Sequence, residues 1–340
     1  MMEGANLKKL INEMDKVVDE CVEGFLKANK NQVKRVGNVN AIARKEAPKQ
    51  GKVGIVIGGG AGHEPLFLEF IGGGMADAVA HGDIFAAPSP NVILEATRAA
   101  AGGEGVLYIY GNYEGDVMNF DMAAEMAKNE GIENETVRVW DDVASASPDE
   151  IEERRGISGD LFIIKIAGAK AETGADLEDV KSTVEKARDN TRSIGIALTS
   201  ATLPNTGEKT FELGEDEMEV GMGVHGEPGV ERIKIKSAEE TVRTMADKVL
   251  EDLPFRSGDE VVTLVNSYGA TTRLELQIVY DEFSSILEER KIDVYDAEIG
   301  AYCTTQDMAG CSITLMKLDR ELKKLYNTDA NSPGYKHFQE

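Results

Sequence analysis

The feature that most restricts the fold is a short β-branched run that ends in three consecutive glycines. Residues 53–57 read Val-Gly-Ile-Val-Ile and are followed directly by Gly58, Gly59 and Gly60. An apolar run without polar alternation is typical of a strand buried on both faces, as in a parallel sheet. Such sheets bind ligands beyond the carboxyl ends of their strands, which is where this glycine loop falls. We therefore predict a parallel α/β layer with a ligand loop at Gly58–Pro65.

The same order of strand, loop and helix recurs and indicates two α/β domains. Val106–Tyr110 is a second strand, and the loop Gly111–Asp116 puts a carboxylate where the first loop puts a histidine. A chain of 340 residues is long enough for about two domains. We predict a first domain at 1–192 with a largely parallel sheet layered by helices, and a second at 193–340 with a smaller mixed sheet.

The remaining elements are predicted from hydrophobic periodicity. Further strands are expected at 136–140, 161–166, 194–199, 261–265, 299–302 and 312–316. Helices are expected at 7–28, 66–71, 91–101, 117–128, 177–190, 237–250, 271–290 and 318–326, with Ser237 as an N-cap. We expect the last dozen residues to be frayed.

The charge balance excludes some classes of partner. The chain has 61 acidic and 37 basic residues, a net charge of −24, which disfavours nucleic acid and anionic membranes. Either a salt-rich cytoplasm or an ordinary acidic enzyme accounts for it. Cys21, Cys303 and Cys311 have neither the number for a disulfide framework nor the spacing for a metal site. With no signal peptide and no long apolar run, we expect a cytoplasmic protein without a metal.

Two of the four histidines lie in glycine-rich loops that continue into Glu-Pro. His63 follows the first glycine run, and His225 lies in Gly221–Gly229, a stretch with four glycines. Glycines let a small ligand approach an imidazole closely because they lack a Cβ atom. A single such loop is equally well explained by local hydrogen bonding. Two loops of matching type favour one shared site.

Known nucleotide and hydrolase motifs are missing. The sequence has no Gly-x-x-x-x-Gly-Lys-Ser/Thr and no Gly-x-Ser-x-Gly. Gly58-x-Gly60 is a weak dinucleotide match, since the third glycine of that fingerprint would fall on His63. Two imidazoles and Asp116 remain, which suit acid–base chemistry near neutral pH or a histidine nucleophile that attacks a carbonyl.

At this point the chain resembles the substrate-binding K subunit of dihydroxyacetone kinase, over nearly its full length. Five blocks carry the resemblance, in order: Gly58-Gly59-Gly60-Ala61-Gly62-His63-Glu64-Pro65, Gly111-Asn112-Tyr113-Glu114-Gly115-Asp116-Val117-Met118-Asn119-Phe120, Ser193-Ile194-Gly195-Ile196-Ala197-Leu198, Gly223-Val224-His225-Gly226-Glu227-Pro228-Gly229 and Gly300-Ala301-Tyr302-Cys303-Thr304. Five such blocks in one order are highly specific.

The resemblance implies a two-domain α/β subunit of the Dak1 and DegV-like type, usually a homodimer. It implies that His225 attacks the ketone of dihydroxyacetone and holds it as a hemiaminal, while His63 and Asp116 act as acid and base. The substrate-binding residues implied are Gly60, Ala61, Gly62, His63, Gly111 and Asp116. A covalent bond to the carbonyl would also reject glycerol, which lacks the ketone.

The chain departs from the family pattern at three positions. Many members have Ser where this chain has Ala61 and Ala87, and Lys where it has Gly111, so those side-chain contacts are not carried over. His81 has no counterpart and is expected at the surface. His337 lies in the expected frayed tail and is assigned no role.

The resemblance also implies partners. Fused family members continue into a helical nucleotide-binding domain, so we expect ATP or ADP with Mg²⁺ on a separate L subunit, charged by ATP or through a phosphotransfer M subunit. No cofactor is expected on this chain. Two alternatives stay open: a non-catalytic regulatory paralogue that binds dihydroxyacetone, and a kinase subunit for another small ketose such as erythrulose.

Overall fold

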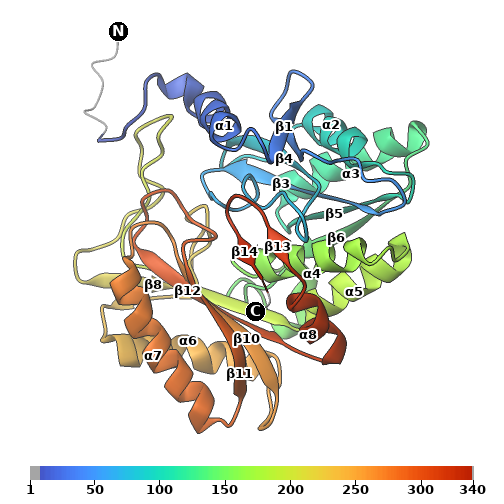
Figure 1. Cartoon of the computed structure of the whole chain (residues 1–340). Coiled ribbons are helices and arrows are strands. Elements are labelled where there is room, and N and C mark those ends of the chain that lie inside the picture. The colour runs from blue at the N-terminus through green and yellow to red at the C-terminus, as the bar shows by residue number, and fades with distance from the viewer. Residues whose placement is uncertain (1–7, 339–340) are drawn as a thin grey trace.

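The glycine-ended run forms the centre of the first sheet in the computed structural model, which describes residues 8–338 (Figure 1). This sheet has the order β1-β2-β4-β3-β5-β6. Its strands are β1 (Val33–Val36), β2 (Ala41–Arg44), β3 (Gly54–Ala61), β4 (Ala78–Ile84), β5 (Val106–Gly111) and β6 (Asn134–Val139). The four strands β4, β3, β5 and β6 are parallel, and the other two continue the sheet antiparallel at one edge. The prediction of a largely parallel sheet is confirmed.

Helices cover both faces of this sheet, because its central strands are apolar on both sides. On β5, Tyr108 and Tyr110 pack with α2 (Pro90–Ala100) and α3 (Glu114–Asn129), whereas Leu107 and Ile109 belong to the core on the opposite face. The opposite face is covered by α4 (Asp160–Glu172) and α5 (Leu177–Asp189), and the apolar side of α1 (Val17–Ala28) joins the same core.

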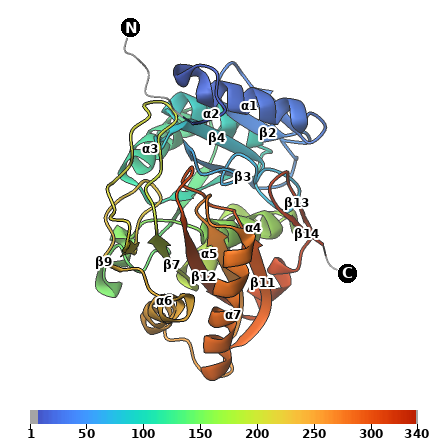
Figure 2. The ribbon, with the colours of Figure 1, turned by 90° about the vertical axis from the view of Figure 1, so that its left-hand side faces the viewer.

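The second sheet is mixed and also has six strands, in the order β11-β10-β12-β7-β8-β9. It is therefore as large as the first sheet rather than smaller. Its strands are β7 (Thr191–Ala197), β8 (Glu217–Val220), β9 (Glu231–Lys234), β10 (Glu260–Ser267), β11 (Asp293–Gly300) and β12 (Gly310–Lys317). Only β10 and β11 are parallel. Two helices that begin with capping boxes, α6 (Ala238–Asp252) and α7 (Arg273–Glu289), pack on the outer face, so the N-cap at Ser237 is confirmed (Figure 2).

The segment 161–166, predicted as a strand, is part of helix α4. Residues 160–171 are all buried, because α4 lies between the two sheets and packs on both (Figure 1). A helix buried on every side shows no 3.6-residue periodicity, so its short apolar run cannot be told from a buried strand.

Three other predicted elements are wrong in position or type. The first α-helix begins at Val17, after a 3₁₀ turn at Met14–Lys16 (η1); Leu10 is exposed, and Leu7 lies outside the described residues. Residues 66–69 form consecutive turns whose apolar side chains point into the core. The strand expected at 299–302 is β11, whose acidic and half-buried residues hide it from an apolar pattern.

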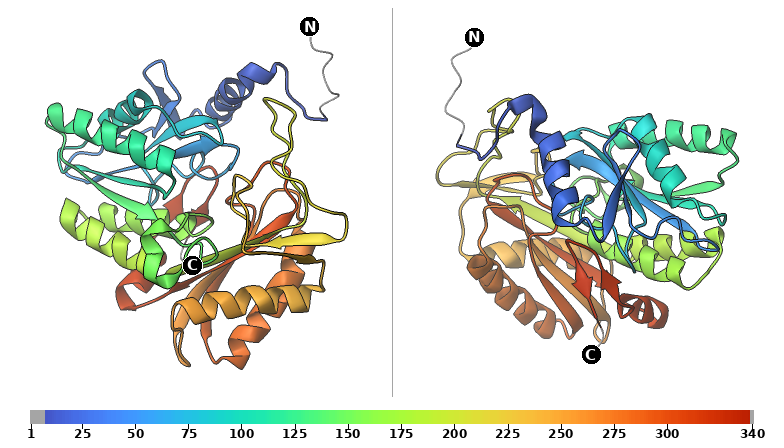
Figure 3. Two further views of the ribbon diagram at one scale, coloured as in Figure 1. Left: turned by 180° about the vertical axis from the view of Figure 1, so that it is seen from behind. Right: turned by 45° about the horizontal axis from the view of Figure 1, so that its top comes forward.

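A long connection leaves the second sheet. Residues 198–216, between β7 and β8, rise beside the start of α1 in both the side and the rear view (Figures 2 and 3). The backbone N–H of Thr202 donates to Asp307, and Lys9 forms an ion pair with the same carboxylate at 2.9 Å. Asp307 therefore joins the N-terminal segment to loops of the second sheet.

The C-terminal residues that the structure describes, up to residue 338, are ordered rather than frayed, and the last two residues of the predicted tail lie outside the description. After α8 (Arg320–Tyr326), β13 (Ala330–Asn331) and β14 (Lys336–His337) form a small hairpin, and Asn331 donates a backbone hydrogen bond to Gly73. This pairing returns the chain to the first sheet. Among the helices of residues 8–338, none combines the length and hydropathy needed to cross a bilayer.

Candidate active site

The predicted site residues come together between the two sheets. His63 follows β3, Asp116 lies in the first turn of α3 just after β5, and His225 lies between β8 and β9. The ring centroids of His63 and His225 are 4.8 Å apart and the rings meet edge to face at 69°. The two glycine-rich loops therefore form one shared site.

The His225 ring is held in one tautomer and one orientation. Its Nδ1 atom lies 2.8 Å from Oε1 of Glu227, and its backbone N–H donates to Oε2 of the same side chain at 2.9 Å. A carboxylate only accepts hydrogen bonds, so Nδ1 carries the hydrogen and the Nε2 lone pair is free. Tyr113 and Phe85 contact the ring edge to face, with centroids 4.6 and 5.3 Å away.

Glu227 keeps its charge despite its burial. Burial alone would raise its pKa, but the hydrogen bond and charge of His225, with backbone N–H donors, outweigh burial and lower the pKa to about 2. Gly226 allows this turn, because its φ of +88° favours glycine. The carboxylate therefore remains an acceptor for Nδ1 throughout the neutral pH range.

His63 is a buried neutral imidazole. Its Nδ1–H donates to the carbonyl of Thr304 at 2.8 Å, which leaves Nε2 with a lone pair and with no hydrogen-bond partner among the described residues. Burial, and next the neighbouring His225, lower the pKa of His63 to about 3. Phe85 stacks on the ring at 4.9 Å. At neutral pH Nε2 of His63 therefore carries no proton and can accept a hydrogen bond from a ligand.

Asp116 is a carboxyl group whose pKa lies near neutrality. It is 8% exposed, and its Oδ1 lacks a hydrogen-bond partner within residues 8–338. Burial raises the pKa to about 7, against the opposing effect of His225. A group that titrates at this pH is well suited to general acid–base work.

These three side chains line one small cavity of about 20 Å³. Its lining includes two of the predicted substrate-binding glycines, Gly60 and Gly111, but neither Ala61 nor Gly62. The complete lining is Gly58, Gly59, Gly60, His63, Leu66, Phe67, Gly111, Tyr113, Asp116, Gly156, Asp160, Val224, His225 and Cys303. A Cβ atom at Gly60 would lie 2.7 Å from the amide nitrogen of Ala86, so only glycine fits there.

Ala87 does not line this cavity. Gly111 does, and its neighbours explain why this position has no side chain. A Cβ atom at Gly111 would lie 3.1 Å from the ring of Tyr113, whose hydroxyl donates to the carbonyl of Gly156. Tyr113 occupies the space into which a longer side chain at this position would extend.

His81 is buried, not at the surface as expected. It lies on β4 beneath the His63 loop, with Nε2 3.4 Å from Oε1 of Glu64. The Glu64 carboxylate in turn accepts the backbone N–H of Gly62 at 3.1 Å. His81 and Glu64 therefore support the loop that carries His63.

Sequence reasoning missed four contributors to the site. Glu227 belongs to one of the recognised motifs, but its contact with Nδ1 of His225 depends on the conformation of the loop, which the sequence does not show. Phe85 and Thr304 act through contacts made across the fold. Asp160 was hidden because its segment was taken for a strand.

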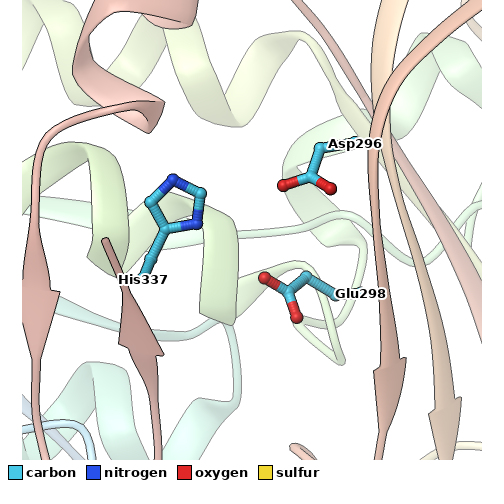
Figure 4. Close-up of side chains that lie close together, drawn as sticks. All are labelled: Asp296, Glu298 and His337. Atoms are coloured by element: carbon cyan, nitrogen blue, oxygen red, sulfur yellow. The ribbon is translucent and has the colours of Figure 1, made fainter. Parts of the chain in front are cut away.

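A second cluster of metal-ligand type lies at the C-terminal hairpin, at Asp296, Glu298 and His337 (Figure 4). Ligand atoms of the three side chains lie within 4.8 Å of one another. Asp296 and Glu298 already accept the hydroxyls of Tyr326 and Tyr335, and burial followed by the charge of Lys165 lowers the pKa of His337. We interpret the cluster as an anchor for the hairpin, and it corrects the view that His337 lies in a frayed tail.

The two α/β layers thus enclose paired imidazoles and a carboxyl group with a pKa near neutrality in one small cavity, an arrangement typical of candidate acid–base sites. Residues 23–334 match the Dak1 domain family. The chain is 43% identical over 331 residues to "PTS-dependent dihydroxyacetone kinase 2, dihydroxyacetone-binding subunit DhaK" of Listeria innocua, covering 97% of this chain and 99% of that protein. The chain therefore belongs to the Dak1 family, as its motifs predicted.

Solved structures agree on the fold. The dihydroxyacetone kinase of C. freundii matches with a TM-score of 0.90 at 33% identity, over 97% of this chain and 60% of that one. Two further relatives bear other names. A D-erythrulose kinase of Mycolicibacterium smegmatis is 40% identical over 97% of this chain and 57% of its own length. A structure named dihydroxyacetone kinase operon co-activator DhaQ matches with a TM-score of 0.86 at 27% identity, over 95% of this chain and 98% of that one.

Proposed function

We propose that this chain is the dihydroxyacetone-binding subunit of a multi-subunit kinase, in which His225 holds the ketone as a hemiaminal for phosphorylation to glycerone phosphate. One observation carries the proposal: the Nδ1 contact with Glu227 leaves Nε2 of His225 as a free nucleophile in a cavity shared with His63 and Asp116. The names of the DhaK relatives support the same reading.

The covalent step balances within the site. The Nε2 lone pair forms a bond to the carbonyl carbon, and the carbonyl π pair moves to oxygen. That oxygen takes up one proton from the carboxylic acid form of Asp116, whose pKa of about 7 leaves it partly protonated at neutral pH. The hydrogen on Nδ1 stays shared with Glu227, whose negative charge stabilises the positive charge that develops on the ring. Glycerol has no carbonyl and cannot form this bond, which gives selection that hydrogen bonds alone would not.

Phosphoryl transfer then needs a base for the attacking hydroxyl. His63 offers a neutral Nε2 lone pair, and Asp116, with a pKa of about 7, can take or return a proton near neutral pH. Asp116 can take the hydroxyl proton as the oxygen attacks phosphorus, while Nε2 of His63 accepts a hydrogen bond that orients the hydroxyl. Gly60 and Gly111 line the ligand by backbone alone, and we propose that Ala61 and Gly62 support that loop from outside the cavity.

The phosphoryl donor is proposed to come from a separate subunit. An L-type partner with ATP or ADP and Mg²⁺, charged directly or through a phosphotransfer M subunit, would dock over the cavity. Relatives named PTS-dependent and PEP-dependent support the phosphotransfer route. We further propose a homodimer that works in the cytoplasm, with a division of the chain into two α/β domains near residue 192.

The alternatives differ in what they require of the site. The relative named D-erythrulose kinase points to a ketose one carbon longer, which His225 could capture by the same bond to its carbonyl. The cavity volume of about 20 Å³ does not discriminate between the two ketoses, because it is close to the space of a single water molecule. The co-activator relative points to a sensor that binds ketone without transfer. A sensor has no need of an acid–base pair, so the convergence of His63 and Asp116 on His225 favours the kinase subunit.

Carbonyl NMR with dihydroxyacetone labelled with ¹³C at C2 tests this proposal. In the purified protein the ketone resonance should be replaced by that of a tetrahedral carbon, and His225→Ala should abolish the new resonance. His337→Gln is the matched control, since it removes an imidazole far from the cavity. An unchanged ketone resonance on binding, or equal binding by His225→Ala, would refute covalent capture.

A further inference from the structure

One carboxyl group in the cavity has no role in the chemistry described above. Asp160 lies at the first position of α4 and is 1% exposed, and its Oδ1 has no hydrogen-bond partner among residues 8–338. Its side chain lines the same cavity as His63, Asp116 and His225. An unpaired buried carboxyl group is costly, so it calls for an explanation.

Helix capping does not explain Asp160. The N–H groups of Ile157 and Gly159, just before α4, donate to Oδ1 and Oδ2 of Asp141 at 2.9 and 2.8 Å. The first N–H groups of α4 itself donate to the backbone carbonyls of residues 157–159. The side chain of Asp160 accepts none of them. The helix N-terminus would be satisfied without it.

Ion pairing does not explain it either. In the described part of the chain, Asp160 takes part in none of the salt bridges, and the charged groups that act on it are the carboxylates of Asp141 and Asp116. Burial first, and these two neighbours next, raise the pKa of Asp160 well above its usual range. This environment favours the carboxylic acid form of the group, which has one O–H donor that can turn toward a ligand.

We propose that the Asp160 carboxyl group is a positioning residue for the ketose, donating a hydrogen bond to a ligand oxygen other than the hydroxyl on which His63 and Asp116 act. The proposal rests on the proposed ketose-binding function. Dihydroxyacetone carries a carbonyl oxygen and two hydroxyls, so one oxygen remains for Asp160 after capture and transfer are assigned. A protonated acid that is buried, as Asp160 is, makes a strong hydrogen bond to such an oxygen because its surroundings are of low polarity.

The test compares Asp160→Asn with Asp160→Leu. Asparagine keeps the size and an N–H donor, whereas leucine keeps the size and removes the donor. Dissociation constants for dihydroxyacetone, measured by titration of the labelled adduct, should stay within about twofold for the Asn variant and weaken roughly tenfold for the Leu variant. Asp160→Ala provides the same comparison should the Leu variant fail to fold.

Stability separates a positioning role from a structural one. Leucine replaces an unpaired buried carboxyl group by an apolar side chain, so Asp160→Leu should unfold at a higher urea concentration while it binds the ketose less tightly. Asp281→Leu, on the exposed face of α7, is the control for the substitution itself.

Three results would count against the inference or its basis in different ways. Unchanged affinity in Asp160→Leu would overturn the inference and leave ketose capture by His225 intact. An Asn variant as weak as the Leu variant would also overturn it, since donation would then not be the property that matters. If the unaltered protein forms no adduct at all, the proposed function itself fails.

Discussion

Replacing Asp116 by asparagine should stabilise the protein while it removes an acid–base group. The folded state holds the pKa of Asp116 at about 7 through burial, whereas the unfolded chain returns it to 3.8. A raised folded-state pKa means that the stabilising contribution is fully present below the unfolded value and is lost as the pH rises through about 7. Asparagine does not ionise and has no such loss.

The size of the effect follows from the pKa difference. Each pKa unit corresponds to about 1.4 kcal/mol, so the full difference between the two states is about 4 kcal/mol at alkaline pH. Between pH 5.5 and pH 7, a range that avoids the isoelectric region near 4.6, the advantage of Asp116→Asn should grow by about 2 kcal/mol. Above pH 7 it should level off.

Urea unfolding at several pH values between 5.5 and 8.5 measures this advantage. Asp281→Asn, at an exposed position of α7, should show no comparable pH dependence and serves as the control. The argument fails if Asp116→Asn gains the same free energy of unfolding at every pH, or gains none at pH 8. Either result would mean that ionisation of the buried Asp116 does not destabilise the folded state. Loss of turnover in the same variant would show a trade of stability for function.

Three further predictions concern the nucleophile, the second sheet and the donor. Glu227→Gln should reduce the labelled hemiaminal about tenfold or more, because an amide N–H facing Nδ1 shifts the hydrogen of His225 to Nε2; an unchanged NMR signal would exclude tautomer control. Gly195→Ala should lower the free energy of unfolding by about 1–3 kcal/mol, because the added methyl clashes with the Tyr268 hydroxyl. Gly24→Ala, in an open position of α1, should instead raise it by about 0.5–1 kcal/mol, and equal effects in urea unfolding would contradict the packing argument. The purified chain alone should give no glycerone phosphate in a coupled NADH assay until an L-type subunit and its donor are added, and steady turnover without them would disprove the division of labour.

Elements that depend mainly on their own residues could be predicted from the sequence. The run at 53–57 had to be a strand buried on both faces, since β-branched residues without polar alternation fit few other places, and it became β3. Ser237 predicted its helix because a capping box depends only on residues three apart. The glycines around His63 and His225 likewise indicated close ligand approach before any fold was known.

Elements whose burial depends on distant segments could not be read in this way. α4 is buried on every face only because a second sheet, formed by later residues, covers the side that the first sheet leaves open. β11 is acidic and half-buried, and the hairpin that covers its Asp296 and Glu298 comes from the far end of the chain. Hydrophobic periodicity arises where one side of an element faces water and the other side faces the core. The burial of these segments depends on neighbours that come from distant parts of the chain, so their sequences do not show it.

The site shows the same division. The sequence by itself pointed to His63, His225 and Asp116 as candidates, because two of only four histidines lie in glycine-rich loops. It did not reveal Glu227 or Asp160. Only the tertiary structure decided their states: burial makes His63 a neutral acceptor, brings the pKa of Asp116 to about 7, and leaves Asp160 without a partner in the same cavity. Those properties arise because residues from both sheets remove water from around the three side chains. The spacing of residues along the chain does not tell how much water the folded protein leaves around them.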